Sequence, residues 1–314
     1  MENKFLSKTF YIIKLFAILN FNLIIIFVAI KLKNIKVCLC TTGKKENLYV
    51  REYVEHYKKY GIDKIFIYDN NELDGEKFED VIYDYIKDGF VQIINVRGLI
   101  SPQANSYKDC HIKNYKKYNW LIFFDMDEFI YLRDYKNIKT FLNNKRFSKC
   151  ERIQLNWIFH TDNNLLYYDN RTLERRFPQR EKKARNQIKG GIQGIKSILR
   201  GNIKTNVYDV HILNKNLTSC DGFGKIKEVQ TIVTNESDFK YYYIDHYYSK
   251  STEEFVYKLM RGSAVHGFDI SHKLKRIEVY FAINEISLNK INYIENKTKL
   301  NLSKYKNILK NIQY

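Results

Sequence analysis

Proline is scarce in this 314-residue sequence, which contains two prolines and 13 glycines. That scarcity excludes collagen-like and proline-rich low-complexity chains. Cysteine is scarce as well. Five cysteines in a chain of this length do not make a disulfide scaffold, and their odd number leaves at least one free or paired with another chain. Cys38 and Cys40 are two positions apart, as expected for one face of a buried strand. With 45% hydrophobic and 15% aromatic residues, the chain can bury a core, which excludes global disorder.

Acidic residues are outnumbered by basic ones, 35 against 53, which gives a formal net charge of +18. An excess of this sign favours a polyanionic or phosphorylated partner. No single basic block dominates, however, and the clusters at residues 56–60 and 114–118 are interpreted as solvated helix faces. One alternative for the whole chain is therefore a non-catalytic, membrane-tethered basic protein that binds nucleic acid or glycans.

A hydrophobic segment, residues 9–30, lies near the N-terminus. Its length fits a membrane span, although Lys14, Asn20 and Asn22 interrupt it. We predict that residues 1–33 form a hydrophobic helix that anchors a single-pass membrane protein, with a cleaved signal peptide as the alternative. The predicted location is the secretory pathway or Golgi in a eukaryote and the envelope in a bacterium. Lysines flank the segment almost equally, so its orientation is left open.

Beyond residue 35, short apolar runs alternate with amphipathic helical runs. This alternation predicts an α/β fold with a Rossmann-like, mostly parallel sheet and helices on both faces. The alternation fails after residue 150, and residues 271–314 are predicted to be a helical extension. The expected strands are residues 37–40, 64–69, 91–96, 119–125, 154–159 and 241–248, and the expected helices are residues 46–61, 77–89, 102–118 and 253–262.

Polar residues follow several of these strands, at the sheet edge where open α/β folds bind ligands. Thr41 and Thr42 follow the first strand, and Asp69 ends the second. The apolar run at residues 119–125 leads into a D-x-D motif, Asp125 and Asp127. In an extended segment these carboxylates share a face and reach one hard cation, Mg²⁺ or Mn²⁺, which also binds the oxygens of a nucleoside diphosphate. The pattern therefore predicts a nucleotide site that contains a metal.

Three segments, in this order, resemble glycosyltransferases of the GT-A fold, in particular glycosyltransferase family 92 and related family-2-like enzymes. They are VCLCTTGKKENLYVREYVEHYKKYGIDKIFIYDN (37–70), NWLIFFDMDEFIYL (119–132) and IDHYYSKSTEEFVYKLMRG (244–262). The resemblance implies a GT-A glycosyltransferase domain at residues 34–270. Residues 34–135 would form its nucleotide-binding half and residues 136–270 its acceptor half.

The resemblance also implies roles for individual residues. Asp125 and Asp127 hold Mn²⁺ or Mg²⁺, and one late histidine, His211 or His246, completes the metal sphere. Three cationic side chains would neutralise the leaving diphosphate, namely Lys250, Lys258 and Arg261. The residues implied to bind the nucleotide sugar are Thr41, Thr42, Asp69, Asp125, Lys250, Lys258 and Arg261.

The implied activity is hexosyl transfer from a nucleoside-diphosphate sugar, a UDP-sugar such as UDP-galactose, to a hydroxyl of a glycan or another acceptor. The acceptor hydroxyl attacks the anomeric carbon with inversion, which needs one carboxylate as base. We assign that base to Asp162, with Asp221 as the alternative. The expected partners are the donor, a glycoconjugate acceptor and the membrane, and no nucleic acid is expected.

Overall fold

The computed structural model describes residues 35–181, 194–205, 211, 216–227, 238–262 and 269–312. The predicted N-terminal anchor, residues 1–33, lies outside this part of the chain. Within it, no helix has both the length and the apolar character that crossing a membrane requires.

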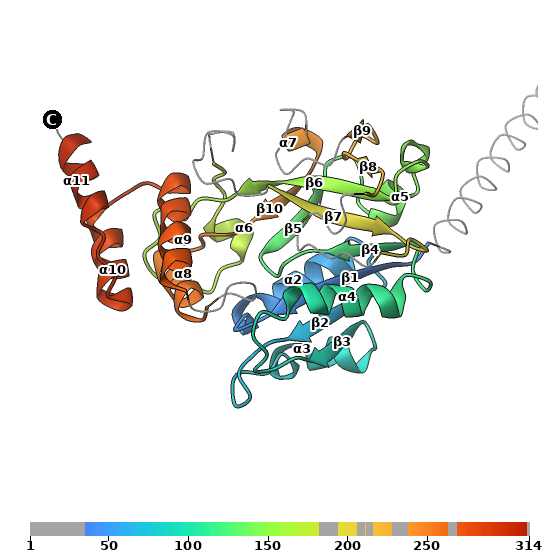
Figure 1. Ribbon diagram of the computed structural model, residues 1–314, viewed down its shortest axis with the longest axis horizontal. Coiled ribbons are helices and arrows are strands. Elements are labelled where there is room, and N and C mark those ends of the chain that lie inside the picture. The colour runs from blue at the N-terminus through green and yellow to red at the C-terminus, as the bar shows by residue number, and fades with distance from the viewer. Residues whose placement is uncertain are drawn as a thin grey trace, which may run out of the picture.

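The first half of the chain folds as the strand–helix alternation predicts (Figure 1). Its strands are all parallel and lie in the order β3-β2-β1-β4. Cys40 of β1 pairs with Phe66 on one side and with Phe123 on the other, so these strands end at a common edge. The elements are β1 (Val37–Gly43), α2 (Asn47–Lys59), β2 (Lys64–Asp69), α3 (Glu79–Lys87), β3 (Val91–Asn95), α4 (Gln103–Asn114) and β4 (Trp120–Phe123).

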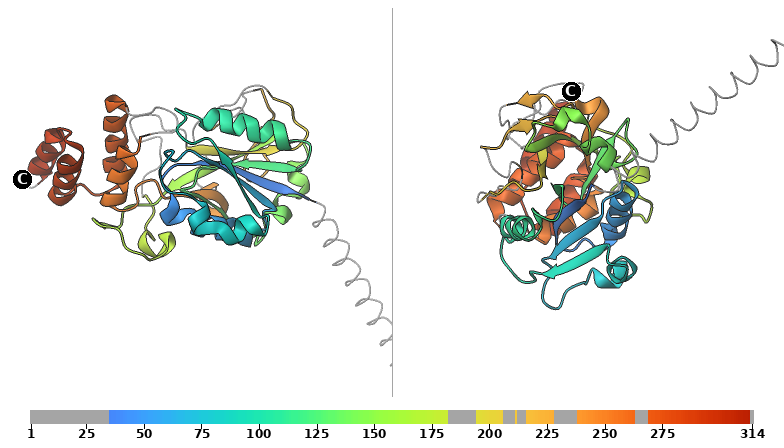
Figure 2. Two further views of the ribbon diagram at one scale, coloured as in Figure 1. Left: turned by 90° about the horizontal axis from the view of Figure 1, so that it is seen from below. Right: turned by 90° about the vertical axis from the view of Figure 1, so that its right-hand side faces the viewer.

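Side-chain alternation along the strands divides the interior into two cores. On β1, Val37 and Leu39 pack in the core that contains the apolar residues of α2 and α3. Cys38 and Cys40 pack in the other, with Tyr107 of α4. Figure 2 shows α4 on one face of the sheet and α2 and α3 on the opposite face. Helices therefore cover both faces, as predicted.

The cysteines form two disulfides. Cys40–Cys110 joins β1 to α4, and Cys150–Cys220 joins the segment before β6 to β8. Cys38 is free and buried, as the odd number of cysteines allows, and it lies on the same face of the buried strand β1 as Cys40, as predicted.

The second half of the sheet is mixed and continues in the order β4-β7-β6-β10-β5. Strand β7 is antiparallel to β4 and β6, β5 is antiparallel to β10, and β6 and β10 are parallel. A mostly parallel sheet is thus correct for the first half and wrong for the second. The connection between β4 and β5 is a short turn, and a strand parallel to β4 would need a long crossover, so β5 runs opposite to β4 at the far edge of the sheet. The elements are β5 (Glu128–Leu132), α5 (Ile138–Leu142), η1 (Lys145–Phe147), β6 (Arg152–Phe159), α6 (Leu173–Arg176), β7 (Ile195–Arg200), β8 (Ser219–Cys220), β9 (Ile226–Lys227), α7 (Asp238–Tyr241) and β10 (Tyr242–His246).

Helix α2 covers the outer edge of β5. The Tyr57 hydroxyl donates to the Glu128 carbonyl at 2.7 Å, and His56 Nε2 lies 3.0 Å from the Ile130 carbonyl. Covering an edge strand satisfies carbonyls that would otherwise invite pairing with another chain. The same bonds fix the start of β5, which follows directly after the D-x-D motif.

The C-terminal part is helical, as predicted, and extends away from the sheet (Figure 1). The helices share a separate apolar core, in which Phe255 stacks on Tyr280 with ring centroids 4.2 Å apart. Helix α8 begins with a capping box between Ser251 and Glu254. The helices are α8 (Thr252–Met260), α9 (Ile270–Ile283), α10 (Leu288–Thr298) and α11 (Ser303–Ile312).

Candidate active site

The D-x-D motif forms a turn between β4 and β5. The Glu128 amide donates to the Asp125 carbonyl at 3.1 Å, and the Asp125 amide donates to Glu128 Oε2 at 3.0 Å. The expectation of an extended segment is therefore wrong. Because the chain reverses here, Asp125 and Asp127 enter different networks.

Asp125 is held on the α4 and β7 side of the turn. Its Oδ1 atom accepts hydrogen bonds from Gln103 Nε2 at 2.6 Å and from the Tyr107 hydroxyl at 2.9 Å. Lys196 Nζ lies 2.9 Å from the same oxygen. Burial would raise the pKa of Asp125, but the nearby Lys196 ammonium lowers it below its ordinary value. Asp125 is thus an ionised and tightly oriented carboxylate.

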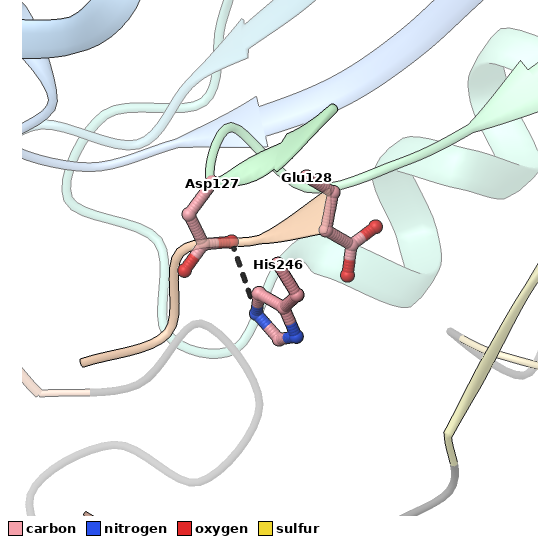
Figure 3. Close-up of side chains that lie close together, drawn as sticks. All are labelled: Asp127, Glu128 and His246. Carbon is pink, nitrogen blue, oxygen red and sulfur yellow. Dashed lines mark ion pairs between the residues drawn. The ribbon is translucent and has the colours of Figure 1, made fainter. Parts of the chain in front are cut away.

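Asp127 belongs to a buried group with Glu128 and His246. One potential ligand atom from each of the three lies within 4.8 Å of the others. His246 Nε2 is 3.5 Å from Asp127 Oδ1, and Figure 3 shows the two carboxylates on either side of the His246 ring. The sheet creates this group, because antiparallel pairing sets His246 of β10 opposite Glu128 of β5.

The chemistry of this group fits Mn²⁺ or Mg²⁺. Two carboxylates and an imidazole suit Mn²⁺, and the carboxylates alone suit Mg²⁺. Glu128 Oε1 is buried and has no hydrogen-bond partner among the described residues, although Lys196 Nζ lies 3.8 Å away. Burial raises the pKa of Glu128 well above its ordinary value, so cation binding would release a proton from this group. Burial alone would raise the pKa of Asp127, but Lys258 and His246 hold it well below its usual range.

Three cations, Lys250, Lys258 and Arg261, line the same edge of the sheet. Lys258 Nζ lies 2.5 Å from Asp127 Oδ2, and burial lowers the Lys258 pKa to about 8. Arg261 Nη2 and Lys250 Nζ lie 2.6 Å and 3.3 Å from the carboxylate of Glu46, which precedes α2. Helix α8 and the residues flanking it therefore gather positive charge over the ends of β1 and β4.

The predicted nucleoside residues lie at the ends of β1 and β2. Thr41 and Thr42 are buried, and the register places Gly43 opposite Asp69. Asp69 is also buried and already bonded: it accepts from Arg97 Nε at 2.7 Å and from the Asn71 amide at 2.9 Å. These bonds fix the loop after β2, and contact of Asp69 with a nucleoside stays a prediction.

Both histidine candidates flank Trp157 of β6. The Trp157 ring lies 4.5 Å from that of His246 and 5.2 Å from that of His211, between centroids. Lys196 is the main cause that lowers the pKa of Asp125 and His211 is a minor one, whereas His246 contacts Asp127. The structure thus brings the two histidines to neighbouring places and sets His246 in the buried group.

The two base candidates hold other parts of the fold. Asp162 is buried and accepts from the Tyr280 hydroxyl at 2.6 Å, and Lys290 Nζ lies 2.7 Å from it. Asp221 accepts from the Phe223 and Lys225 amides, which closes a turn. Both carboxylates therefore stabilise local structure through these contacts, and the identity of the catalytic base stays a prediction.

Several residues of the site were not anticipated. Glu128 was adjacent to the motif and acidic, which was a usable signal. The others lie far apart in the sequence and come together only in the fold: Glu46 before α2, Gln103 and Tyr107 of α4, Trp157 of β6 and Lys196 of β7.

Comparison with known proteins agrees with the sequence motifs. The model of glycosyltransferase family 92 matches residues 33–277. The chain belongs to glycosyltransferase family 92. Family 92 proteins of Arabidopsis thaliana and Ricinus communis are 28% identical over 102 residues and 26% identical over 110 residues. These matches cover 32% and 35% of this chain but only 17% and 20% of the relatives' length.

Solved structures add a distant likeness. Residues 1–349 of Staphylococcus aureus TarS, in complex with UDP, match with a TM-score of 0.39 and 10% identity, over 84% of this family 92 chain and 79% of that chain. The same TarS fragment in complex with UDP-GlcNAc matches with a TM-score of 0.37 and 11% identity, over 84% and 79% of the two chains.

Proposed function

We propose that this family 92 protein is a metal-dependent hexosyltransferase. It moves a sugar from a nucleoside-diphosphate sugar, a UDP-sugar with UDP-galactose as the first candidate, to a hydroxyl of a glycan or another acceptor, with inversion. The observation that carries the proposal is the meeting of a buried Asp127–Glu128–His246 group with three cations at the carboxyl-end edge of the sheet. Oxygen and imidazole ligands beside a cationic face suit a divalent cation together with a diphosphate.

The side chains of the site would have different roles according to their positions. Asp127, Glu128 and His246 would hold Mn²⁺ or Mg²⁺, which supplies positive charge for the diphosphate that leaves. Lys250, Lys258 and Arg261 would bind the diphosphate oxygens directly. In the structure these cations face Glu46 and Asp127, so their charges are already ordered before a donor arrives. Cationic groups that are already ordered would stabilise the negative charge that develops on the leaving diphosphate.

The nucleoside and the base complete the proposal. Thr41, Thr42 and Asp69 lie at adjacent strand ends and would border the nucleoside. Inversion requires a carboxylate beside the acceptor hydroxyl, and Asp162 remains our first candidate for that base, with Asp221 second. Replacing each by Asn would separate the two, because only the base variant should keep donor binding while losing transfer.

We also propose a membrane-tethered protein in an oxidising compartment, the secretory pathway or the envelope. The Cys40–Cys110 and Cys150–Cys220 disulfides support the compartment, because such bonds persist outside the reducing cytosol. The hydrophobic segment at residues 9–30 supports the tether.

A sugar-nucleotide hydrolysis panel, run with Mn²⁺, with Mg²⁺ and with a chelator, tests the function. We expect metal-dependent release of nucleoside diphosphate from one UDP-sugar, faster when an acceptor glycan is added. The anomeric configuration of the product, measured by NMR, tests inversion. Binding of glycans or nucleic acid without any turnover would favour the non-catalytic alternative.

A further inference from the structure

We infer that Lys196 is a positioning residue, whose buried ammonium holds Oδ1 of Asp125 and keeps that oxygen out of the metal's ligand set. The inference rests on the proposed function, because it concerns the same site. Lys196 has no exposed surface, and its Nζ lies 2.9 Å from Asp125 Oδ1 and 3.8 Å from Glu128 Oε1. A buried ammonium requires such a partner, so the Lys196–Asp125 contact constrains both side chains.

The antiparallel direction of β7 places Lys196 at the turn. Ser197 pairs with Phe123, the last residue of β4, so Lys196 lies one residue beyond the end of that strand. Lys196 therefore reaches Asp125 from β7, the strand next to β4, whereas His246 reaches Asp127 from β10.

Two hydrogen-bond donors and the Lys196 ammonium, which forms an ion pair, contact the same oxygen of Asp125. Gln103 Nε2, the Tyr107 hydroxyl and Lys196 Nζ surround Oδ1, whereas no bond to Oδ2 is found in the described part of the chain. The Asp125 side chain is 28% exposed, so one oxygen points inward and the carboxylate still reaches the open side of the site. Turning Oδ1 toward a cation would leave the Lys196 ammonium buried without its partner.

This arrangement has a consequence for cation affinity. A fixed positive charge beside Asp125 and Glu128 repels Mn²⁺, and it does so strongly because the surroundings are buried. Removal of that charge should therefore strengthen Mn²⁺ binding. Turnover should fall at the same time, because Asp125 would lose its orientation.

The Lys196→Met variant tests these opposed effects. Mn²⁺ affinity is measured by calorimetry at pH 8 without donor, and we expect it to become about 10-fold tighter. The value of kcat/KM for the preferred UDP-sugar should fall about 10-fold or more. A residue with a purely structural role would lower the melting temperature and leave Mn²⁺ affinity unchanged or weaker, and that result would overturn the inference.

A second variant keeps the inference testable if Lys196→Met does not fold. Tyr107→Phe removes one donor to Asp125 and preserves the ring, so the donor KM should rise about 3-fold or more while Mn²⁺ affinity stays constant. An unchanged KM would refute the positioning of Asp125.

Lys290→Met is the matched control, because Lys290 is also buried and paired with a carboxylate, Asp162, outside the metal group. It should lower stability without changing Mn²⁺ affinity. Measurements on the wild-type protein distinguish a failure of the proposed function from a failure of the inference about Lys196. If it binds neither Mn²⁺ nor UDP, the proposed function fails. If it binds both and Lys196→Met does not bind Mn²⁺ more tightly, only the inference fails.

Discussion

Replacement of Glu254 by glutamine should destabilise the protein by about 3 kcal/mol. Glu254 is 6% exposed and joins three elements. Its carboxylate lies 2.7 Å from Arg176 Nη1, accepts from the Tyr49 hydroxyl at 2.5 Å and accepts from the Ser251 amide at 3.0 Å. Glutamine has one acceptor oxygen, which can keep the bond from the Ser251 amide but not the bond from Tyr49 as well, and it removes the charge that balances Arg176, which is 2% exposed.

The magnitude follows from that geometry. Removing one partner of a buried ion pair costs about 3–5 kcal/mol, and the lower end applies because the α8 cap is retained. For a chain of this size, a loss of about 3 kcal/mol corresponds to about 5 °C in melting temperature. Glu254→Ala should cost about 1 kcal/mol more, because it also removes the capping box.

The effect should depend on pH. Burial would raise the pKa of Glu254, but Arg176 and the bonds from Ser251 and Tyr49 lower it below its ordinary value. The stabilisation from a carboxylate with a lowered pKa is present above the unfolded pKa, about 4.3, and is lost as pH falls through the folded pKa. The difference between the wild type and Glu254→Gln should therefore be constant from pH 6 to pH 8 (about 3 kcal/mol) and shrink below about pH 4.

Urea unfolding of the two proteins, with Glu278→Gln as control, measures this difference. Glu278 pairs with Lys304 on the surface at 3.1 Å, so its loss should cost less than about 1 kcal/mol. Equal stability losses for the buried and the surface variant would refute the reasoning. So would a Glu254→Gln effect that grows toward acid pH.

Three further predictions follow from single contacts. Asp127→Asn should weaken Mn²⁺ binding about 10-fold or more by calorimetry, and turnover should fall further than UDP affinity; Mn²⁺ affinity equal to that of the wild type would remove Asp127 from the metal group. Burial lowers the pKa of His56 to about 4. As pH falls, His56 therefore takes up a proton in the unfolded state before it does so in the folded state, and the free energy of unfolding should drop by about 3 kcal/mol between pH 6.5 and pH 4. Unfolding of His56→Gln, which should lack that part of the drop, checks it. Loss of Cys150–Cys220, whose partners are 70 residues apart, should cost about 4 kcal/mol in urea unfolding, and a loss below about 1 kcal/mol would contradict the loop-entropy argument.

The sequence by itself determined the parts of the fold that depend on local periodicity. The strand at residues 64–69 has the bounds that its apolar run predicts, and the helix expected at residues 46–61 is α2, Asn47–Lys59. In these segments the apolar pattern and the turn residues at the ends indicate the same element, so local preference and tertiary packing select the same structure. The ordered motifs also identified the family, which the match to residues 33–277 confirms.

Only the tertiary structure decided the composition of the site. The spacing of Asp125 and Asp127 suggested one shared face, but the turn that closes at Glu128 sends them into different networks. The antiparallel directions of β7 and β5 bring Lys196 beside Asp125 and His246 beside Glu128. Strand direction and order are set by long-range burial and by the lengths of the connections, and no periodic pattern along the chain encodes them. For that reason the sequence could locate the acidic motif, whereas the ion pairs around it had to come from the folded sheet.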